Sequence, residues 1–112
     1  MRDEDKVRLQ HIIEEAKMAC SFVQGCTFED FVKDEKTVRA VIRSVEVIGE
    51  AASKISNELK NTHNEVPWGK IIGMRNRLIH VYFDIDYDVV WQTVHKNIPE
   101  LIEIMQKLLK EK

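Results

Sequence analysis

Apolar residues recur at steps of three and four along most of this chain, which is the spacing of α-helices buried along one face. The pattern is clearest over residues 34–61, where it continues for roughly three heptads. This apolar seam consists of Val38, Val41, Val45, Ile48, Ala52, Ile55 and Leu59. It predicts one long helix that packs nearly parallel or antiparallel to a neighbour.

Glycine and proline are rare, with four and two copies in 112 residues, so the frequent turns of a β-rich fold are missing. Gly25, Thr27 and Pro67 stand where helices would end or begin. Apolar spacing predicts helices over residues 3–24, 27–33, 34–61 and 67–82. A further helix starts at Asp84, Asp86 or both, and the last spans residues 98–110. We therefore predict an all-α fold in one domain, residues 1–112, built as an up-and-down bundle of four or five helices.

Charge and cysteine content restrict the partners and the compartment. The net charge of −2 gives no global attraction for nucleic acid, so such a partner needs a local basic patch, as formed by Lys70, Arg75 and Arg77. Cys20 and Cys26 have neither CxxC nor zinc-site spacing. The charged first residues and the lack of a long apolar run favour a cytoplasmic protein without a membrane span.

The stretch from Met74 to Tyr82 carries the residues best suited to chemistry. Arg75 lies five positions before His80, and Tyr82 lies two positions after it. Arginine is a fixed cation that suits phosphate oxygens, and histidine moves protons near neutral pH. Together they are candidate residues for a reaction on a phosphodiester.

Helical geometry makes Arg75 unusual, because it falls in the middle of the apolar stripe Trp68, Ile71, Ile72, Leu78 and Ile79. An unpaired buried arginine is costly, so Arg75 needs an acidic partner, a wet cleft or a second chain. On an ideal helix His80 lies about 140° around from Arg75. Either the helix ends or bends near His80, or two chains pair and each contributes; we favour a homodimer with a shared cleft.

Simpler structural roles remain open for the same residues. Arg75 could pair with an acid while His80 lies on the surface, and Asn76 could hydrogen-bond His80 one helical turn on. Tyr82 could be a core residue with a hydrated hydroxyl. A metal site is not expected, because His11, His63, His80 and His95 lie in separate segments.

Three stretches resemble the HepT-like family of HEPN domains, and the resemblance extends over nearly the whole chain. They are the stretch from Val66 to Phe83, with Pro-Trp and Gly-Met-Arg-Asn around the Arg-x4-His-x-Tyr element, the stretch from Asp86 to Trp91 followed by Ile98-Pro99-Glu100-Leu101, and the stretch from Arg43 to Ala52.

The resemblance implies an all-α HEPN-like bundle that forms a homodimer, with the motifs of two chains lining one cleft. It implies a metal-independent endoribonuclease toxin of a type VII-like toxin–antitoxin system that needs no cofactor. The partner of such toxins is an MntA-type nucleotidyltransferase, which silences the toxin by transferring AMP from ATP to the motif tyrosine. By position, Arg75 and His80 would be catalytic, Asn76 accessory, and Tyr82 the AMP acceptor.

A second interpretation is a non-catalytic helical subunit that docks on a nucleotidyltransferase and presents a substrate to it. A third is a plain dimeric bundle. Intact Arg75 and His80 favour the ribonuclease, since a scaffold has no need of them.

Overall fold

The computed structural model describes residues 1–79 and 84–111. All regular elements of this part of the chain are helices, so the all-α prediction is confirmed. None of the described helices combines the length and the apolar character that crossing a membrane requires.

The first two helices form where the sequence predicts them. α1 spans Asp3–Phe22, and the chain then turns at Gly25, whose φ of 75° is the left-handed conformation that favours glycine. α2 spans Phe28–Lys33 and begins with a capping box: the Thr27 hydroxyl accepts from the Asp30 N–H, and the Asp30 carboxylate accepts from the Thr27 N–H.

The prediction of one long helix over residues 34–61 is wrong, because this segment forms two helices. They are α3, Glu35–Ser53, and α4, Asn57–Thr62. The Ser53 hydroxyl donates to the Glu50 carbonyl at 2.6 Å, and the Ser56 hydroxyl caps α4 by accepting from the Leu59 N–H. Both serines thus form side-chain bonds that compete with a continuous helix. The seam nevertheless stays buried across the break, since Ile55 and Leu59 are 3% and 6% exposed.

The helix predicted over residues 67–82 is also interrupted, and its described part ends early. α5 spans Trp68–Ile72, Gly73 breaks the helix, and α6 spans Met74–Leu78. Ile79 is extended and forms an isolated antiparallel bridge with Ile85. Ile79 is β-branched, and this residue type favours extended backbone over helix.

The last helical run is nearly continuous. α7 spans Tyr87–Gln92 and is capped by Asp86, one of the two predicted starts. A π-helical segment, η2 (Thr93–Asn97), joins it directly to α8, Ile98–Lys110, whose bounds are as predicted. Pro99 does not end the helical run; the turn before it widens instead, because proline has no N–H to donate.

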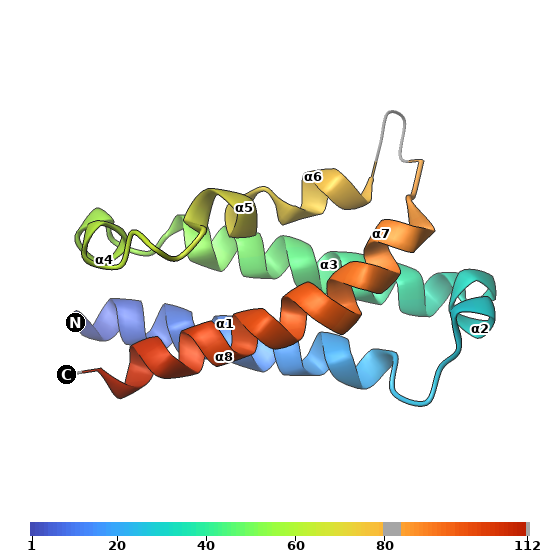
Figure 1. The fold of residues 1–112 in the computed structure, drawn as a ribbon, viewed down its shortest axis with the longest axis horizontal. Coiled ribbons are helices and arrows are strands. Elements are labelled where there is room, and N and C mark those ends of the chain that lie inside the picture. Colours follow the sequence, from blue (N-terminus) through green and yellow to red (C-terminus); the bar gives the residue numbers. More distant parts are fainter. Residues whose placement is uncertain (80–83, 112) are drawn as a thin grey trace.

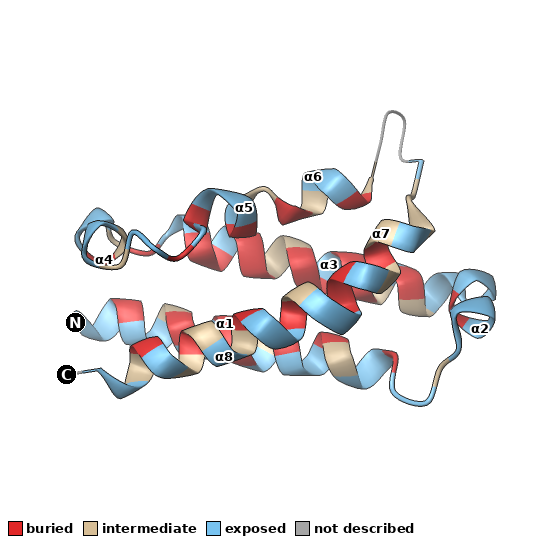
Figure 2. Cartoon of the chain, in the orientation of Figure 1, coloured by how far each residue is buried: buried red, intermediate tan, exposed pale blue. Residues whose placement is uncertain are grey.

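Figure 1 shows the chain running back and forth along one long axis, with α1, α3, the α5–α6 pair and the α7–η2–α8 run in alternating directions. α1 packs against both α3 and α8, and α5 and α6 lie on α3. Buried residues line the inward faces of these helices, and exposed residues cover their outer faces (Figure 2). The predicted apolar stripe holds in part: Trp68, Ile71 and Leu78 are buried, whereas Ile72 is 38% exposed.

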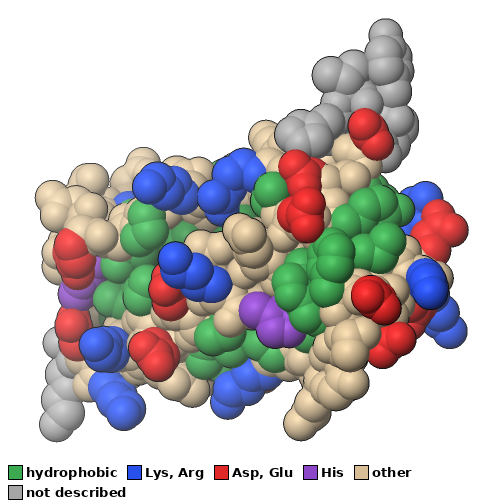
Figure 3. Space-filling view, turned by 45° about the vertical axis from the view of Figure 1, so that its right-hand side comes forward, with side chains coloured by type: hydrophobic (Ala, Val, Ile, Leu, Met, Phe, Trp, Pro, Cys, Tyr) green, Lys and Arg blue, Asp and Glu red, His purple; other side chains and the backbone are tan. Residues whose placement is uncertain are grey.

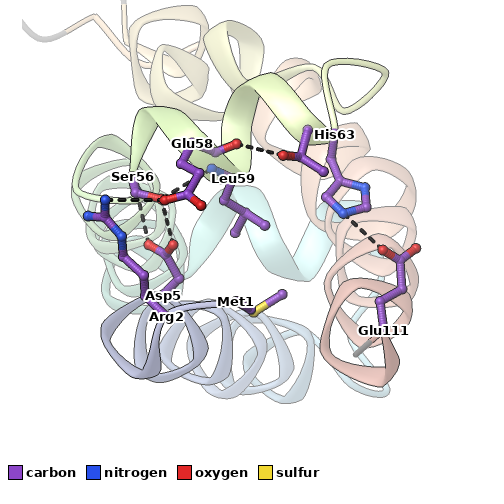
Figure 4. Close-up of a pocket in the computed structure, with 9 residues that line it drawn as sticks. Met1, Arg2, Asp5, Ser56, Glu58, Leu59, His63 and Glu111 are labelled. Atoms are coloured by element: carbon purple, nitrogen blue, oxygen red, sulfur yellow. Dashed lines mark hydrogen bonds and ion pairs between the residues drawn. The ribbon is translucent and has the colours of Figure 1, made fainter.

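A buried carboxylate ties α1 to the break between α3 and α4 (Figure 4). Asp5 is only 3% exposed and accepts from the Ser56 N–H at 2.9 Å and the Ser56 hydroxyl at 2.6 Å. At the other side of the same pocket, His63 Nε2 lies 2.9 Å from a Glu111 carboxylate oxygen. These contacts fasten the end of the bundle opposite to the end where α6 stops (Figure 1).

Candidate functional site

Arg75 is the predicted site residue that the structure places most clearly. It lies on α6, its side chain is 35% exposed, and its Nε is 3.4 Å from a Glu46 carboxylate oxygen on α3. The sequence required an acid, a wet cleft or a second chain for Arg75, and Glu46 supplies the acid. The pair joins α6 to α3 and keeps the arginine at a half-buried position.

The ion pair does not satisfy Arg75 fully. Nε is buried and has no hydrogen-bond acceptor among the described residues, because its approach to Glu46 lacks hydrogen-bond geometry. Glu46 also pairs with Arg43 one turn earlier on α3. A carboxylate shared between two arginines leaves guanidinium donors without an acceptor, and a catalytic role is one physical reason for such a buried donor.

A surface pocket lies between α3 and the Ile79–Ile85 bridge. Its lining residues are Arg39, Ile42, Arg43, Glu46, Ile79 and Ile85. The four residues from α3 are spaced by three and four positions, so they form one stripe of that helix. The bridge and the hydrogen bond from the Asp86 N–H to the Leu78 carbonyl, 2.9 Å long, hold the opposite wall in place.

The charges around this pocket favour an anion. Arg39, Arg43 and Arg75 contribute three cations that remain charged at any physiological pH. Glu46 and Glu35 offset part of this charge, since Glu35 pairs with Arg39 at 2.9 Å. Exposed pairs of this kind are weak, so a phosphate group can compete for the arginines.

A close backbone contact sets the position of α5 and α6 on α3. A Cβ added at Gly49 would lie 2.8 Å from the Ile72 carbonyl oxygen, closer than real Cβ atoms approach. Glycine at position 49 therefore lets the end of α5 lie directly on α3. After Gly73, α6 begins at the next residue, Met74. At Gly69, by contrast, an added Cβ would meet no atom within 4 Å.

The remaining predicted site residues divide into two groups. Asn76 lies on α6 next to Arg75 and is exposed. His80 and Tyr82 lie outside the described residues. α6 ends at Leu78, so the ideal-helix separation of Arg75 and His80, and the helical Asn76–His80 hydrogen bond, both rest on a helix that does not continue to Ile79.

The sequence analysis missed the roles of Glu46, Arg43 and Gly49. The predicted need of Arg75 for an acid was the available signal, because Glu46 is an acid within the helix predicted over residues 34–61. This need alone could not distinguish Glu46 from Glu50 as the partner of Arg75. Which of the two glutamates meets Arg75 depends on the position of α6 along α3. Gly49 gave no signal of its own within a helical pattern.

These features define a class: an all-α protein that presents a half-buried arginine beside a pocket lined by two further arginines. The family model described as "Ribonuclease HepT-like" matches residues 12–108. Nearly the whole chain is matched, so it belongs to the HepT-like ribonuclease family.

Several relatives carry related names. A protein named "Putative RNase" from Caldanaerobacter subterraneus subsp. tengcongensis is 44% identical over 103 residues, 92% of this chain and 92% of the relative. A protein named "Probable ribonuclease HepT" from Thermococcus cleftensis is 43% identical over 110 residues, 98% of this chain and 100% of the relative. A protein named "Putative RNase" from Methanocaldococcus jannaschii is 39% identical over 103 residues, 92% of this chain and 85% of the relative. No solved structure gives a significant match.

Proposed function

We propose that this chain is a metal-independent endoribonuclease in which Arg75 and His80 are the catalytic residues and Asn76 is an accessory. The observation that carries the proposal is Arg75 itself: a half-buried arginine, paired with Glu46, with a buried Nε that lacks a hydrogen-bond acceptor among the described residues. The two other arginines at the neighbouring pocket support an anionic substrate. Family membership and the ribonuclease names of the relatives point to RNA.

The reaction uses the nucleophile that RNA carries. His80 removes the proton of a 2′-hydroxyl, the 2′-oxygen forms a bond to the adjacent phosphorus, and the bond from phosphorus to the 5′-oxygen breaks. The acid is His80 of a second copy, which protonates the leaving 5′-oxygen. Arg75 stabilises the negative charge that develops on the phosphoryl oxygens. The products are a 2′,3′-cyclic phosphate, or its hydrolysed form, and a 5′-hydroxyl end.

In this proposal the active form is a homodimer whose cleft is lined by the motifs of both chains. Ile72, the last residue of α5, is 38% exposed and gives an apolar contact for a second copy to bury. Two copies would also supply the two histidines that a base and an acid require. The second copy would close a site that is open to solvent at Asn76 in the single chain.

Regulation in this proposal acts on Tyr82. A partner of the MntA nucleotidyltransferase type transfers AMP from ATP to the Tyr82 hydroxyl, forming a tyrosyl O–P bond and releasing pyrophosphate. The added phosphate carries negative charge and competes with RNA for the arginines. Such a chain would act as the toxin of a type VII-like toxin–antitoxin pair.

The test uses purified protein in which mass spectrometry shows an unmodified Tyr82. The parent chain and the His80→Ala and Arg75→Ala variants are incubated with total cellular RNA in EDTA. We expect cleavage by the parent with 2′,3′-cyclic phosphate ends, and losses of at least about a hundredfold in both variants. Cleavage that leaves only 3′-hydroxyl ends would contradict the mechanism. Silencing of Tyr82→Phe by the partner would contradict the regulation.

A non-catalytic docking subunit of a nucleotidyltransferase remains the second candidate function. It is favoured by the Arg75–Glu46 pair, because an arginine with a carboxylate partner can serve structure alone. Under this alternative neither the parent nor the variants cleave RNA, and Arg75→Ala lowers the melting temperature. Binding of the partner transferase would then be the activity to measure.

A further inference from the structure

A groove on the other flank of α6 has the composition of a nucleotide-binding surface. It lies where α5 and α6 face η2 and α8, and its lining residues are Pro67, Lys70, Ile71, Met74, Arg77, Asn97, Glu100, Leu101 and Ile104. We propose that this groove binds the single-stranded RNA substrate on one side of the scissile phosphate. The inference rests on the proposed ribonuclease function, in which Lys70 and Arg77 have no assigned role.

The floor and the rim of the groove differ in character. Ile71, Met74 and Leu101 are 4%, 3% and 3% exposed and form an apolar floor. Lys70 and Arg77 are exposed at the rim, and neither forms an ion pair within the described part of the chain. Figure 3 shows basic side chains along the upper edge of this face, over α5 and α6, with apolar surface beside them. Unpaired cations along one rim of a groove suit the phosphates of a single strand.

The position of Arg77 connects the groove to the site. Residues two apart on an α-helix point about 200° away from one another. Arg75 reaches α3, where it pairs with Glu46, whereas Arg77 lines the groove against α8. α6 therefore carries one arginine on each flank, and a strand that crosses α6 contacts both. The phosphate at Arg75 is the one that reacts, and the phosphates at Arg77 and Lys70 lie farther along the strand.

The polar residues of the groove suggest how the strand is oriented. Glu100 is the acid that lines this groove, and it repels phosphate but can accept from an exocyclic amino group of a base. Asn97 can donate to and accept from a base edge. Both come from the η2–α8 side, and both cations come from the α5–α6 side. The backbone of the strand thus lies along α5–α6, and its bases point toward α8.

Binding is measured with a fluorescently labelled 2′-O-methyl oligonucleotide, which lacks the nucleophile and so reports binding without cleavage. The test variant is the double substitution Lys70→Ala and Arg77→Ala. The matched control is Lys6→Ala with Arg8→Ala, which removes the same charge from α1 outside the groove. We expect affinity to fall about tenfold in the test variant, with the salt slope smaller by about 1.4, since each single-strand phosphate contact contributes about 0.7. The control should bind like the parent.

Cleavage gives the second readout. With a long RNA the test variant should show a raised KM and an unchanged kcat, whereas with a dinucleotide, too short to reach the groove, it should match the parent.

Unchanged oligonucleotide affinity in the test variant, an equal loss in the control, or an equal loss on the dinucleotide would overturn the inference. If the parent cleaves no RNA but binds the oligonucleotide through Lys70 and Arg77, the proposed ribonuclease fails and the groove stands as an RNA-binding site. A parent that binds no oligonucleotide overturns the groove as well.

Discussion

At the scale of single residues, Arg75 shows how far sequence reasoning reaches. Its place in an apolar stripe predicted that it needs a partner, and the structure supplies one in Glu46. The identity of that partner depends on the packing of α6 on α3, which residue spacing does not encode. Ion pairs between distant segments form only after the elements have docked, so local patterns predict the need but not the solution.

The first prediction concerns Glu46 as a positioning residue. Glu46→Gln keeps the shape of the side chain but weakens its hold on Arg75, so the guanidinium is less well placed for the phosphate. We expect kcat on RNA to fall about tenfold, with KM the same or lower, because a small misplacement affects the transition state more than binding. Initial rates over a range of RNA concentrations measure both constants.

Glu50→Gln is the matched control, since Glu50 is an exposed glutamate one turn later on α3. It should leave kcat and the melting temperature unchanged. A Glu46→Gln variant with the kcat of the parent would show that the ion pair serves packing alone.

At the scale of elements, apolar periodicity predicted where helices lie better than where they break. The seam continues through the α3–α4 break because Ile55 and Leu59 remain buried on either side of Ser56. Periodicity therefore cannot detect that break, and only the hydrogen bonds of Ser53 and Ser56 reveal it. Strong cap signals were more reliable: Thr27 and Asp86 both cap the helices that they were expected to start.

The second prediction tests the close contact of α5 with α3. Gly49→Ala places a methyl group against the Ile72 carbonyl, a backbone atom that cannot swing aside. We expect a loss of about 1–3 kcal/mol in the free energy of unfolding, as for other overpacked sites. RNA cleavage should also fall, because α5 and α6 shift relative to Glu46. Urea unfolding and initial rates measure the two effects.

Gly69→Ala provides the comparison within the same pair of helices. Its added methyl group has open space, and alanine favours the helix, so stability should be unchanged or should rise by up to about 1 kcal/mol. Equal stability losses in the two variants would show that the close contact with the Ile72 carbonyl does not set the cost of Gly49→Ala.

The third prediction concerns the start of α3 and its dependence on pH. The Asp34 carboxylate accepts from the Thr37 hydroxyl at 2.6 Å and from the Thr37 N–H at 3.1 Å. These two hydrogen bonds, with the hydroxyl bond as the larger cause, lower the pKa of Asp34 below its ordinary value. A lowered pKa in the folded state stabilises the fold fully above the ordinary carboxyl range, and this contribution is lost as pH falls through the lowered pKa.

Asp34→Asn tests this, because asparagine still caps a helix but does not titrate. The parent should lose more stability than the variant as the pH is lowered from about 4 toward 2. Urea midpoints at several pH values measure the difference. Parallel acid profiles for the two proteins would contradict a role for this carboxylate.

At the scale of the whole molecule, the all-α architecture followed from the lack of turn residues and the helical spacing. The α1 contacts with α3 and α8, and the layer of α5 and α6 on α3, form one elongated body (Figure 1). The sequence could not predict which helix faces pack against one another. That depends on details such as a glycine contact at Gly49 and a buried carboxylate at Asp5. Family membership supplied the reaction class, which the fold alone does not imply.

The last prediction belongs to the proposed pair of chains. If two copies line one cleft and share the acid and base roles, the single chain lacks half of its proton-transfer groups. Specific activity should then fall on dilution in parallel with the dimer fraction from analytical ultracentrifugation, reaching about half where half of the chains are monomeric. Ile72→Glu, which puts a charge on the exposed apolar residue next to α6, should shift both curves to higher concentration. A chain that is monomeric at micromolar concentration yet keeps full specific activity would show that Arg75 and His80 of one chain suffice.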